Sequence, residues 1–194
     1  FLAIKWRARL EAHLGTFSCN LLKSNAMKFM DDALKISILN SACSVVDLVL
    51  PEREGYQNLY LQFFSLIDNL SESRFIINYI FWEIDLLQSL GFGLDLSRCC
   101  VSGEKEDLFY LSPKTGRAVS EKKGKPYHDR LFPLPSFLIN RTNSDSISSV
   151  EIKNAFNITT YFLGRYVFGV DKKEPWDRKQ LVDRLIKMDT MSSS

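Results

Sequence analysis

The sequence predicts a mainly α fold, in which a helical bundle carries a small β-knuckle insertion and follows two N-terminal β-strands. Three observations support this prediction. Apolar residues recur at helical spacing through most of residues 31–90 and again from residue 150 onward. This period is lost between residues 92 and 135. In the first 22 residues, polar and apolar side chains alternate instead, which is typical of an extended chain.

The N-terminal strands are expected to carry cations on one face and apolar side chains on the other. Lys5, Arg7 and Arg9 alternate with apolar residues, and a glycine separates them from a second alternating run at residues 16–22. Because two strands alone are marginally stable, we expect them to belong to a sheet whose other strands lie upstream of residue 1. The first residue is Phe rather than Met, in line with this expectation.

Three successive helices are expected next, joined by short polar breaks as in a helical bundle. Asp31 or Asp32 can cap the first helix, and Pro51 ends it because proline lacks an amide N–H. Ser71 or Ser73 can open the third helix. The expected ranges are residues 31–50, 56–70 and 71–90.

An extended segment and a hairpin are expected after the third helix. Gly91 can adopt the left-handed conformation that ends a helix without a Cβ clash. A short strand at residues 109–111, a turn at 112–116 and a return strand at 117–120 follow from the β-branched, aromatic and turn-forming residues there. A basic, glycine-containing loop comes after the return strand.

Two closing helices are expected at residues 150–168 and 176–188. The polar residues 140–149 between the insertion and these helices are expected to form a flexible linker. The serines at the C-terminus are expected to form a disordered tail.

The composition is that of an ordinary globular protein, with 45% hydrophobic and 25% charged residues. The longest apolar stretch, residues 75–90, is interrupted by Asn78, Glu83 and Asp85, so no membrane span is expected. A net charge of +2 neither requires nor excludes a polyanionic partner.

The four cysteines do not indicate a disulfide scaffold. Cys19 and Cys43 lie in apolar sequence contexts typical of buried free thiols. Cys99 and Cys100 are adjacent and could pair with each other only under strain. We therefore expect a reducing, cytoplasmic setting.

Cys99 begins a sequence that is similar to one half of a zinc knuckle. Ser102 stands where the second cysteine of a Cys-x-x-Cys-Gly knuckle would be, and residues 116–120, where a second pair could lie, contain no cysteine. A structural zinc site needs four Cys or His ligands, usually as two pairs. The sequence therefore favours a metal-free knuckle, and no cofactor is expected.

Two cation-rich segments are candidates for nucleic-acid contact. The first strand can follow phosphates with its cations and stack bases on an aromatic residue, or it can be a solvated face with Trp6 in the core. Residues 114–130 carry six cations and two acidic residues, a local charge of +4, which suits phosphate contact but is also common in solvated loops. The candidate DNA-binding residues are Lys5, Arg7, Arg9, Lys114, Arg117, Lys122, Lys123, Lys125 and Arg130.

Catalytic motifs are weak. Neither His13 nor His128 belongs to a nucleophile motif. His128, Asp129 and Ser136 can be written as a triad, but the two prolines between them argue for chance. We therefore assign no catalytic residue and do not expect an enzyme. The aromatic residues between positions 56 and 82 can form a peptide groove or a plain hydrophobic core, and their pattern favours the core.

From Trp6 onward, the sequence resembles the RecO family of bacterial DNA repair and recombination mediators. Five stretches carry this resemblance, and they occur in the order expected for the family and span nearly the whole chain. The incomplete zinc set of this sequence is similar to that of the alphaproteobacterial branch of the family. The stretches are WRARLEAHLG, LLQSLGFGLDLSRC, FYLSPKTGRAVS, RLFPLPSFL and NITTYFLGRYVF.

The resemblance implies how the chain is organised, because the family has an N-terminal OB-fold, a helical domain and a small knuckle that binds zinc in some members. Residues 1–23 would be the C-terminal strands of a truncated OB-fold, and residues 24–91 the first part of the helical domain. Residues 92–135 would be a zinc-knuckle-like insertion without a full metal set. Residues 136–194 would be the closing helices and a disordered tail.

The resemblance also implies a role in the RecF recombination pathway. Family members bind single- and double-stranded DNA, anneal complementary strands and help RecA load on strands coated with single-stranded DNA-binding protein. The implied partners are the acidic tail of that protein and RecR, with no membrane. Lys5, Arg7 and Arg9 would lie on the OB domain, and the basic loop would extend the same surface.

The alternative is a helical protein-interaction module that binds an acidic tail through a cation beside an apolar pocket, with incidental DNA contact.

Overall fold

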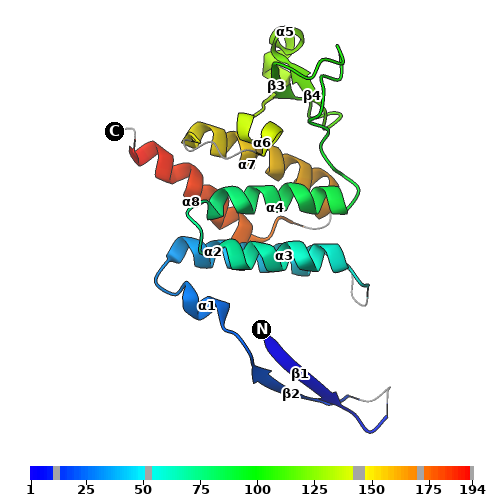
Figure 1. Cartoon of the computed structure of the whole chain (residues 1–194), viewed down its shortest axis with the longest axis vertical. Helices are drawn as coiled ribbons and strands as arrows, with labels where there is room; N and C mark the ends of the chain where they lie inside the picture. The colour runs from blue at the N-terminus through cyan, green and yellow to red at the C-terminus, as the bar shows by residue number, and fades with distance from the viewer. Residues whose placement is uncertain (11–13, 51–53, 142–146, 170–172, 193–194) are drawn as a thin grey trace.

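The chain folds into a helical bundle with a two-stranded ribbon at one end and a small three-stranded sheet at the other (Figure 1). This computed structural model describes residues 1–10, 14–50, 54–141, 147–169 and 173–192. The arrangement confirms the predicted mainly α fold with a β-knuckle insertion and two N-terminal strands, and these strands fit an OB-fold remnant.

The N-terminal ribbon consists of β1 (Leu2–Arg7) and β2 (Thr16–Leu21), paired antiparallel. Lys5 lies opposite Ser18, and Trp6 lies opposite Phe17. Directly opposed residues of such a pair share a face, so the predicted separation of cations from apolar side chains is confirmed. Trp6 is 46% exposed, however, so the alternative that placed it in a core is wrong for the described part of the chain.

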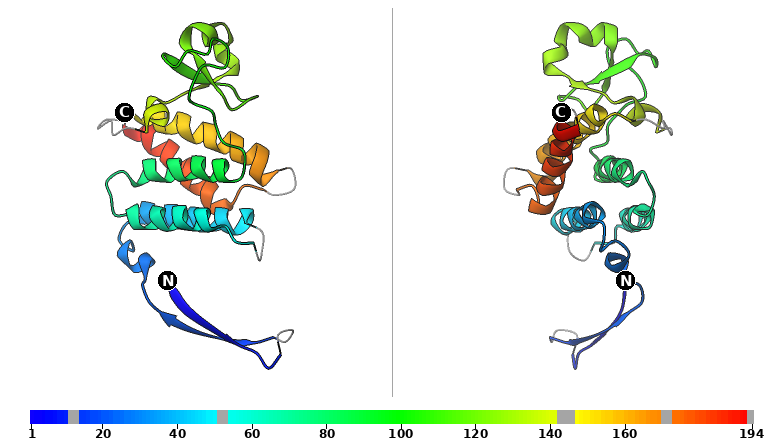
Figure 2. Two further views of the ribbon diagram at one scale, coloured as in Figure 1. Left: turned by 45° about the vertical axis from the view of Figure 1, so that its right-hand side comes forward. Right: turned by 90° about the vertical axis from the view of Figure 1, so that its left-hand side faces the viewer.

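The ribbon is joined to the bundle at its base. The Phe1 ring lies 4.8 Å from that of Phe64, and Lys23 Nζ lies 2.8 Å from an Asp68 carboxylate oxygen. Both partners belong to α3 (Gln57–Asn69). Away from this base, the strands extend clear of the helices in each view (Figure 2).

The first helices follow the predicted ranges closely. After the short α1 (Asn25–Lys28), Asp32 caps α2 (Ala33–Val49) by accepting hydrogen bonds from the backbone N–H groups of Leu34 and Lys35, both at 3.1 Å. The predicted serine cap for α4 (Phe75–Ser89) is wrong, because Arg74 stands at the N-cap position and its side chain does not make a capping hydrogen bond. Pro51, predicted to end α2, lies outside the described residues.

The insertion contains the predicted hairpin, β3 (Leu108–Leu111) and β4 (Ala118–Ser120), and a third strand, β5 (Phe132–Pro133), in the order β4-β3-β5. The basic segment after β4 is not a loop. It forms α5 (Glu121–Gly124) and a 3-10 helix, η1 (Lys125–Arg130). Gly124 allows this turn to pack on the sheet, since a Cβ there would lie 2.3 Å from Tyr110 Cδ2.

The closing part contains α6 (Ser136–Asn140), α7 (Ser149–Leu163), a π-helical turn η2 (Gly164–Phe168) and α8 (Trp176–Ser192). A reciprocal capping box between Ser148 and Glu151 starts α7. Of the predicted linker, residues 142–146 lie outside the described chain, and residue 149 is already helical. The last helix continues four residues past its predicted end, and the final two serines are outside the described residues.

Helices α2, α4, α7 and α8 enclose the main core, and α3 packs on α4. Among the most buried side chains are Ile38 on α2, Ile80 and Leu87 on α4, and Phe156 and Ile158 on α7. The aromatic helices thus form a packed core, as their pattern favoured. Tyr60 on α3 is an exception, since it is 58% exposed.

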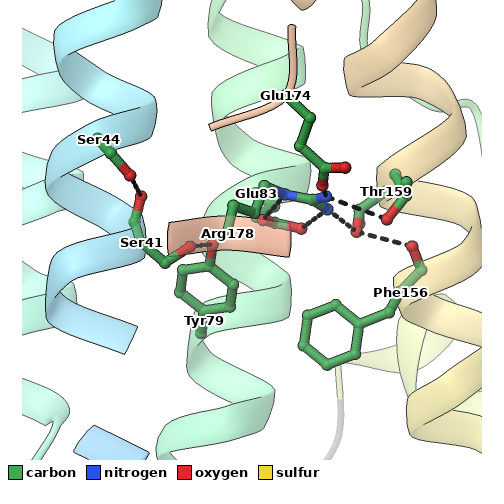
Figure 3. A network of polar contacts seen from close by, with 9 residues as sticks. Ser41, Ser44, Tyr79, Glu83, Phe156, Thr159, Glu174 and Arg178 are labelled. Atoms are coloured by element: carbon green, nitrogen blue, oxygen red, sulfur yellow. Dashed lines mark hydrogen bonds and ion pairs between the residues drawn. The ribbon is translucent and has the colours of Figure 1, made fainter. Parts of the chain in front are cut away.

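A buried ion pair joins α4 to α8 inside this core (Figure 3). Arg178 Nε donates to Glu83 Oε1 at 2.7 Å and Arg178 Nη2 donates to Glu83 Oε2 at 2.9 Å, with both side chains fully buried. The guanidinium also donates to Thr159 and Thr160 at 3.1 Å and to Glu174. Burial of Arg178 opposes its charge, but Glu83 outweighs this effect and raises the pKa of the guanidinium further above its ordinary value.

A second buried polar contact lies beside the ion pair. The hydroxyl groups of Ser41 on α2 and Tyr79 on α4 are 2.7 Å apart. Burial and the neighbouring carboxylate of Glu83 raise the pKa of Tyr79 well above 10, so its hydroxyl stays neutral. Helices α2, α4, α7 and α8 are therefore linked by polar contacts as well as by packing.

Replacing Glu83 by glutamine would leave the buried guanidinium of Arg178 without its main counter-charge. We expect the free energy of unfolding, measured by urea denaturation, to fall by about 3–5 kcal/mol. The exposed pair Lys23–Asp68 offers a matched control, and Asp68→Asn should change stability by less than about 1 kcal/mol. The double variant Glu83→Leu with Arg178→Met removes both charges and should recover much of the loss. A double variant less stable than Glu83→Gln would contradict this explanation.

Candidate nucleic-acid interface

The predicted cations of the N-terminal segment form one exposed basic face. Lys5 and Arg7 lie on the same face of β1, opposite Ser18 and Thr16 of β2, and Arg9 follows in the exposed bend after the strand. Neither strand contains an acidic residue. We call this the ribbon face. The ribbon face presents positive charge to solvent. The hydroxyl groups of Ser18 and Thr16 on the neighbouring strand lie beside the cations on this face.

The other predicted cations lie on the insertion, at the opposite end of the molecule (Figure 1). All six are exposed: Lys114 in the β3–β4 turn, Arg117 before β4, Lys122 and Lys123 on α5, and Lys125 and Arg130 on η1. The expectation that this segment extends the surface of the N-terminal strands is therefore wrong. The helical bundle separates the two groups of cations.

Acidic neighbours reduce the positive charge of the insertion. Arg117 Nε lies 3.2 Å from Asp95 Oδ2. Lys122 lines a hollow of about 460 Å³ together with Lys105 and four acidic residues, Glu104, Glu106, Asp107 and Glu121. These acids come from the segment before β3 and from the start of α5, so counting residues 114–130 alone missed three of the four. Residues 92–135 as a whole contain eight Lys or Arg residues and six Asp or Glu residues, a net charge of +2.

In the incomplete zinc set, Cys99 is the cysteine present, Ser102 replaces its partner, and Arg117 and Ser120 lie in the region of the second pair. The Cys99 sulfur accepts hydrogen bonds from the backbone N–H groups of Ser102 at 3.5 Å and Ser120 at 3.2 Å. The Ser102 hydroxyl donates to Glu104 at 2.9 Å, and Arg117 is bonded to Asp95. The Ser120 hydroxyl is buried and has no hydrogen-bond partner among the described residues.

These residues do not fit zinc. One sulfur is present where structural sites use four Cys or His ligands, and Ser102 and Arg117 are engaged elsewhere. In the described part of the chain, no three His, Cys, Asp or Glu side chains are grouped so that they could hold a metal ion. Backbone hydrogen bonds close the insertion instead: Cys99 N–H donates to Glu104 O at 2.7 Å, and Cys100 N–H to Ala118 O at 2.8 Å.

The sulfur of Cys99 ionises more readily than an ordinary thiol. Its burial opposes the charged form, but the hydrogen bonds from Ser102 and Ser120 together outweigh that effect and lower the pKa from 9.0 to about 6. At neutral pH the group is therefore largely a thiolate, a stronger acceptor for these two N–H groups than a neutral thiol.

All four cysteines are free, as the sequence predicted. The expectation that Cys19 and Cys43 are buried is wrong, since both are exposed. Cys19 lies on the apolar face of the two-stranded ribbon, opposite Ile4, and Cys43 lies on α2.

His128, Asp129 and Ser136, which could be combined into a catalytic triad from the sequence, do not form one in the structure. His128 Nε2 lies 2.9 Å from Asp129 Oδ1, but both side chains are exposed, and the ring's Nδ1 lies 3.1 Å from the Lys125 carbonyl oxygen. The Ser136 hydroxyl donates to Glu151 at 2.9 Å. His128 thus does not activate this serine. His13 lies outside the described residues.

Of the hollows on the described part of the helical bundle, two bear on peptide binding. One, of about 200 Å³, is lined by apolar side chains of α2, α3 and α4, including Val46, Phe63 and Trp82, and its charged lining residue is Glu54. The other, of about 600 Å³, lies between α2 and α8, where Trp176 and Leu181 meet two cations, Arg184 and Lys187, and two acids, Asp177 and Asp183.

A column of aromatic rings at the junction of the bundle and the insertion was missed in the sequence. Phe162 on α7, Tyr166 on the π-helical turn and Phe92 after α4 stack in succession. Nothing in the helical periodicity links Phe162 and Tyr166 to Phe92, which lies 70 residues before Phe162 in the sequence. The Gly-Phe-Gly sequence at 91–93 was the available signal, because it indicates a sharp turn that fixes the phenylalanine.

A family model and individual related proteins indicate the same family for this chain. Residues 30–175 match the family described as Recombination protein O C terminal. The chain is 42% identical to the DNA repair protein RecO of Rickettsia canadensis over 163 residues, covering 84% of this chain and 67% of that protein. It is 39% identical to the DNA repair protein RecO of Rhodospirillum centenum over 194 residues, covering 98% of this chain and 76% of that protein. The described helices include none with the length and apolar character that a membrane span requires.

The contribution of Cys99 to stability should depend on pH. Because its pKa is lower in the folded chain than the ordinary 9.0, the stabilisation from its ionisation is complete above about pH 9 and is lost as the pH falls through about 6. The loss of unfolding free energy caused by Cys99→Ala should thus be larger at about pH 8.5 than at about pH 5.5 in urea titrations. Cys100→Ala is the neighbouring control, and an equal loss at both pH values for Cys99→Ala would refute the thiolate.

The purified chain should retain far less than one zinc ion after dialysis, and a chelator should leave its melting temperature unchanged. Metal analysis and thermal unfolding measure these two quantities. The triple variant Ser102→Cys, Arg117→Cys, Ser120→Cys supplies the missing sulfurs and should retain one zinc ion. One equivalent of zinc in the unaltered chain would overturn the metal-free description.

Proposed function

The chain belongs to the RecO family, and on that premise we propose that it acts in DNA repair by binding DNA and annealing complementary strands. We further propose that it helps a recombinase load on DNA coated with single-stranded DNA-binding protein, within the RecF recombination pathway. The family membership carries the repair role. The ribbon face, with three exposed cations and no acid on either strand, is the observation that best supports DNA contact.

The ribbon face is our first choice for phosphate binding. Two cations on the same face of one strand are about 7 Å apart, close to the spacing of successive phosphates in a nucleic-acid strand. The face differs from the insertion in that none of its cations forms an ion pair with another described residue. Lys5, Arg7 and Arg9 can therefore exchange counterions for phosphates without first breaking an ion pair to a described residue.

The insertion is proposed as a second, weaker phosphate surface. Lys123 and Lys125 form no ion pair with described residues, whereas Lys122 lies among acidic side chains and Arg117 is paired with Asp95. Lys114 and Arg130 are exposed at either end of this group. We retain all six residues as proposed contacts, with Lys123 and Lys125 as the ones that the charge distribution supports best.

Annealing requires no covalent step in this proposal. Two complementary strands repel each other through their phosphates, and cations that neutralise some of these phosphates lower the repulsion and release counterions. Base pairing itself then provides the driving force for annealing. We accordingly propose a binding protein without catalytic residues.

A second proposed function is binding of the acidic tail of single-stranded DNA-binding protein. The hollow between α2 and α8 supports it, because Arg184 and Lys187 lie there beside Trp176 and Leu181. Asp177 and Asp183 in the same hollow oppose it and should keep the affinity modest. The apolar hollow near Trp82 fits such a tail less well, since Glu54 has the wrong charge. RecR remains a proposed partner without an assigned surface.

Salt titration of single-strand binding tests the proposed DNA surfaces. The double variant Lys5→Ala, Arg7→Ala should reduce the slope of log affinity against log salt by about 1.4, or about 0.7 per lost phosphate contact. Lys122→Ala with Lys123→Ala should reduce it by about half as much, because acidic groups already surround Lys122. Fluorescence anisotropy with a labelled oligonucleotide measures both slopes.

The control for this titration is a pair of exposed lysines outside both surfaces, Lys28→Ala with Lys153→Ala, which should leave the slope unchanged. If the chain does not bind DNA at low salt but does bind an acidic peptide, the proposed DNA function is wrong and the protein-interaction function replaces it.

A further inference from the structure

We propose that the ring of Phe92 is a stacking site for a base of single-stranded nucleic acid, with Arg165 positioned for the adjoining phosphate. This inference rests on the proposed DNA binding and adds to it a base contact through an aromatic side chain that is not among the predicted DNA-binding residues. It depends on how α4 ends, on a column of aromatic rings, and on a fixed cation beside that column.

The end of α4 fixes the position of Phe92. Gly91, at φ +87°, donates its N–H to Gln88 O at 3.1 Å, and Phe92 donates its N–H to Leu87 O at 2.8 Å. This pair of hydrogen bonds is a Schellman motif, in which the left-handed residue turns the chain sharply out of the helix. Phe92 is therefore held by the backbone of a buried helix, although its own side chain is 39% exposed.

Phe92 is the outer ring of an aromatic column. Its ring lies 4.9 Å from that of Tyr166 with the two planes 3° apart, and Tyr166 lies 6.0 Å from Phe162 with the planes 20° apart. Phe162 is buried at 1% exposure, and Tyr166 is half-buried. The column thus runs from the core to the surface and ends in an exposed aromatic ring, the geometry that a stacked base would extend by one more layer.

Arg165 brings positive charge to the same place. Its guanidinium lies 5.2 Å from the centre of the Tyr166 ring and donates from Nη1 to Pro113 O at 3.1 Å and Tyr161 Oη at 3.0 Å. These contacts fix the group without neutralising it, because both acceptors are uncharged. The residue is exposed, and the exposed Lys114 is next to Pro113 in the turn that Arg165 contacts.

The combination favours a nucleic-acid strand over an apolar partner. An exposed ring parallel to the ring beneath it suits a flat ligand, whereas cations next to it suit a ligand that carries negative charge at short intervals. The acid closest to this site in sequence, Asp95, is already paired with Arg117 at 3.2 Å. The site also lies on a π-helical turn, a feature that is frequent at functional sites.

The test compares an oligothymidylate with an abasic oligonucleotide of the same length, so that phosphates are kept and bases removed. Phe92→Leu should lower the affinity for oligothymidylate roughly 5- to 140-fold, the range for loss of one aromatic–base stack, and leave the affinity for the abasic strand unchanged. Arg165→Gln should lower both affinities equally, because it removes a phosphate contact. Anisotropy titrations at low salt measure the affinities of both variants and of the unaltered chain for the two oligonucleotides.

Phe109→Leu is the matched control. Phe109 is 50% exposed on the same insertion and meets Tyr110 edge-on instead of ending a parallel column, so its replacement should affect neither strand. Phe92→Trp keeps a stacking ring and should retain the affinity. Its fluorescence should be quenched by oligothymidylate and not by the abasic strand, which keeps the test valid if Phe92→Leu unfolds the junction.

Two outcomes separate failure of this inference from failure of the proposed function. If the chain binds oligothymidylate and Phe92→Leu binds it equally well, or Phe92→Trp shows no quenching, the stacking site is wrong while DNA binding stands. If the unaltered chain binds neither strand at low salt, the proposed function fails and the stacking site fails with it.

Discussion

The buried pair of Glu83 and Arg178 is the constraint on which the rest of the structure depends. It connects residues 95 positions apart, and the two threonines that share the guanidinium bring α7 into the same network. A charged pair tolerates less displacement than apolar packing, because each charge loses its partner if the helices slide. The pair and its threonines therefore fix the middle of α4 against the first turn of α8 and the C-terminal part of α7. The positions of both ends of α4 follow from this register.

The C-terminal end of α4 shows why this register matters. The Schellman motif at Gly91 turns the chain toward the insertion and brings Phe92 onto the π-helical turn after α7. The turn between β3 and β4 then packs on the same place, where a Cβ on Gly116 would lie 3.3 Å from Leu94 and 3.5 Å from Phe162. The insertion is thus attached to the bundle by side-chain packing. Within the insertion, backbone hydrogen bonds to the Cys99 sulfur hold together the segments that a metal ion joins in a zinc knuckle.

Much of the fold could be predicted from the sequence, because the signals are local. Helical periodicity, the Asp32 cap and the alternation around Lys5 each depend on residues within a few positions. The helical nature of residues 121–130 was missed because it depends on Gly124 packing against Tyr110, a tertiary contact. The Glu83–Arg178 pair was missed for the same reason, since Glu83 was taken as evidence against a membrane span and its partner lies on another helix. The six cations of the insertion were found, but not the acids from residues 104–107 that fold beside Lys122.

Local charge in the sequence is therefore a poor guide to surface charge in this chain. The segment with the larger number of cations is the one that tertiary structure partly neutralises, whereas the two-stranded ribbon keeps its cations because its strands contain no acid and no described ion pair involves them. The same reasoning separates Arg165 from Arg117. Both are exposed arginines near the β3–β4 turn, but Arg117 is bonded to a carboxylate and Arg165 to uncharged oxygens. A cation held by neutral acceptors keeps its charge and its position together, which is what binding a phosphate requires.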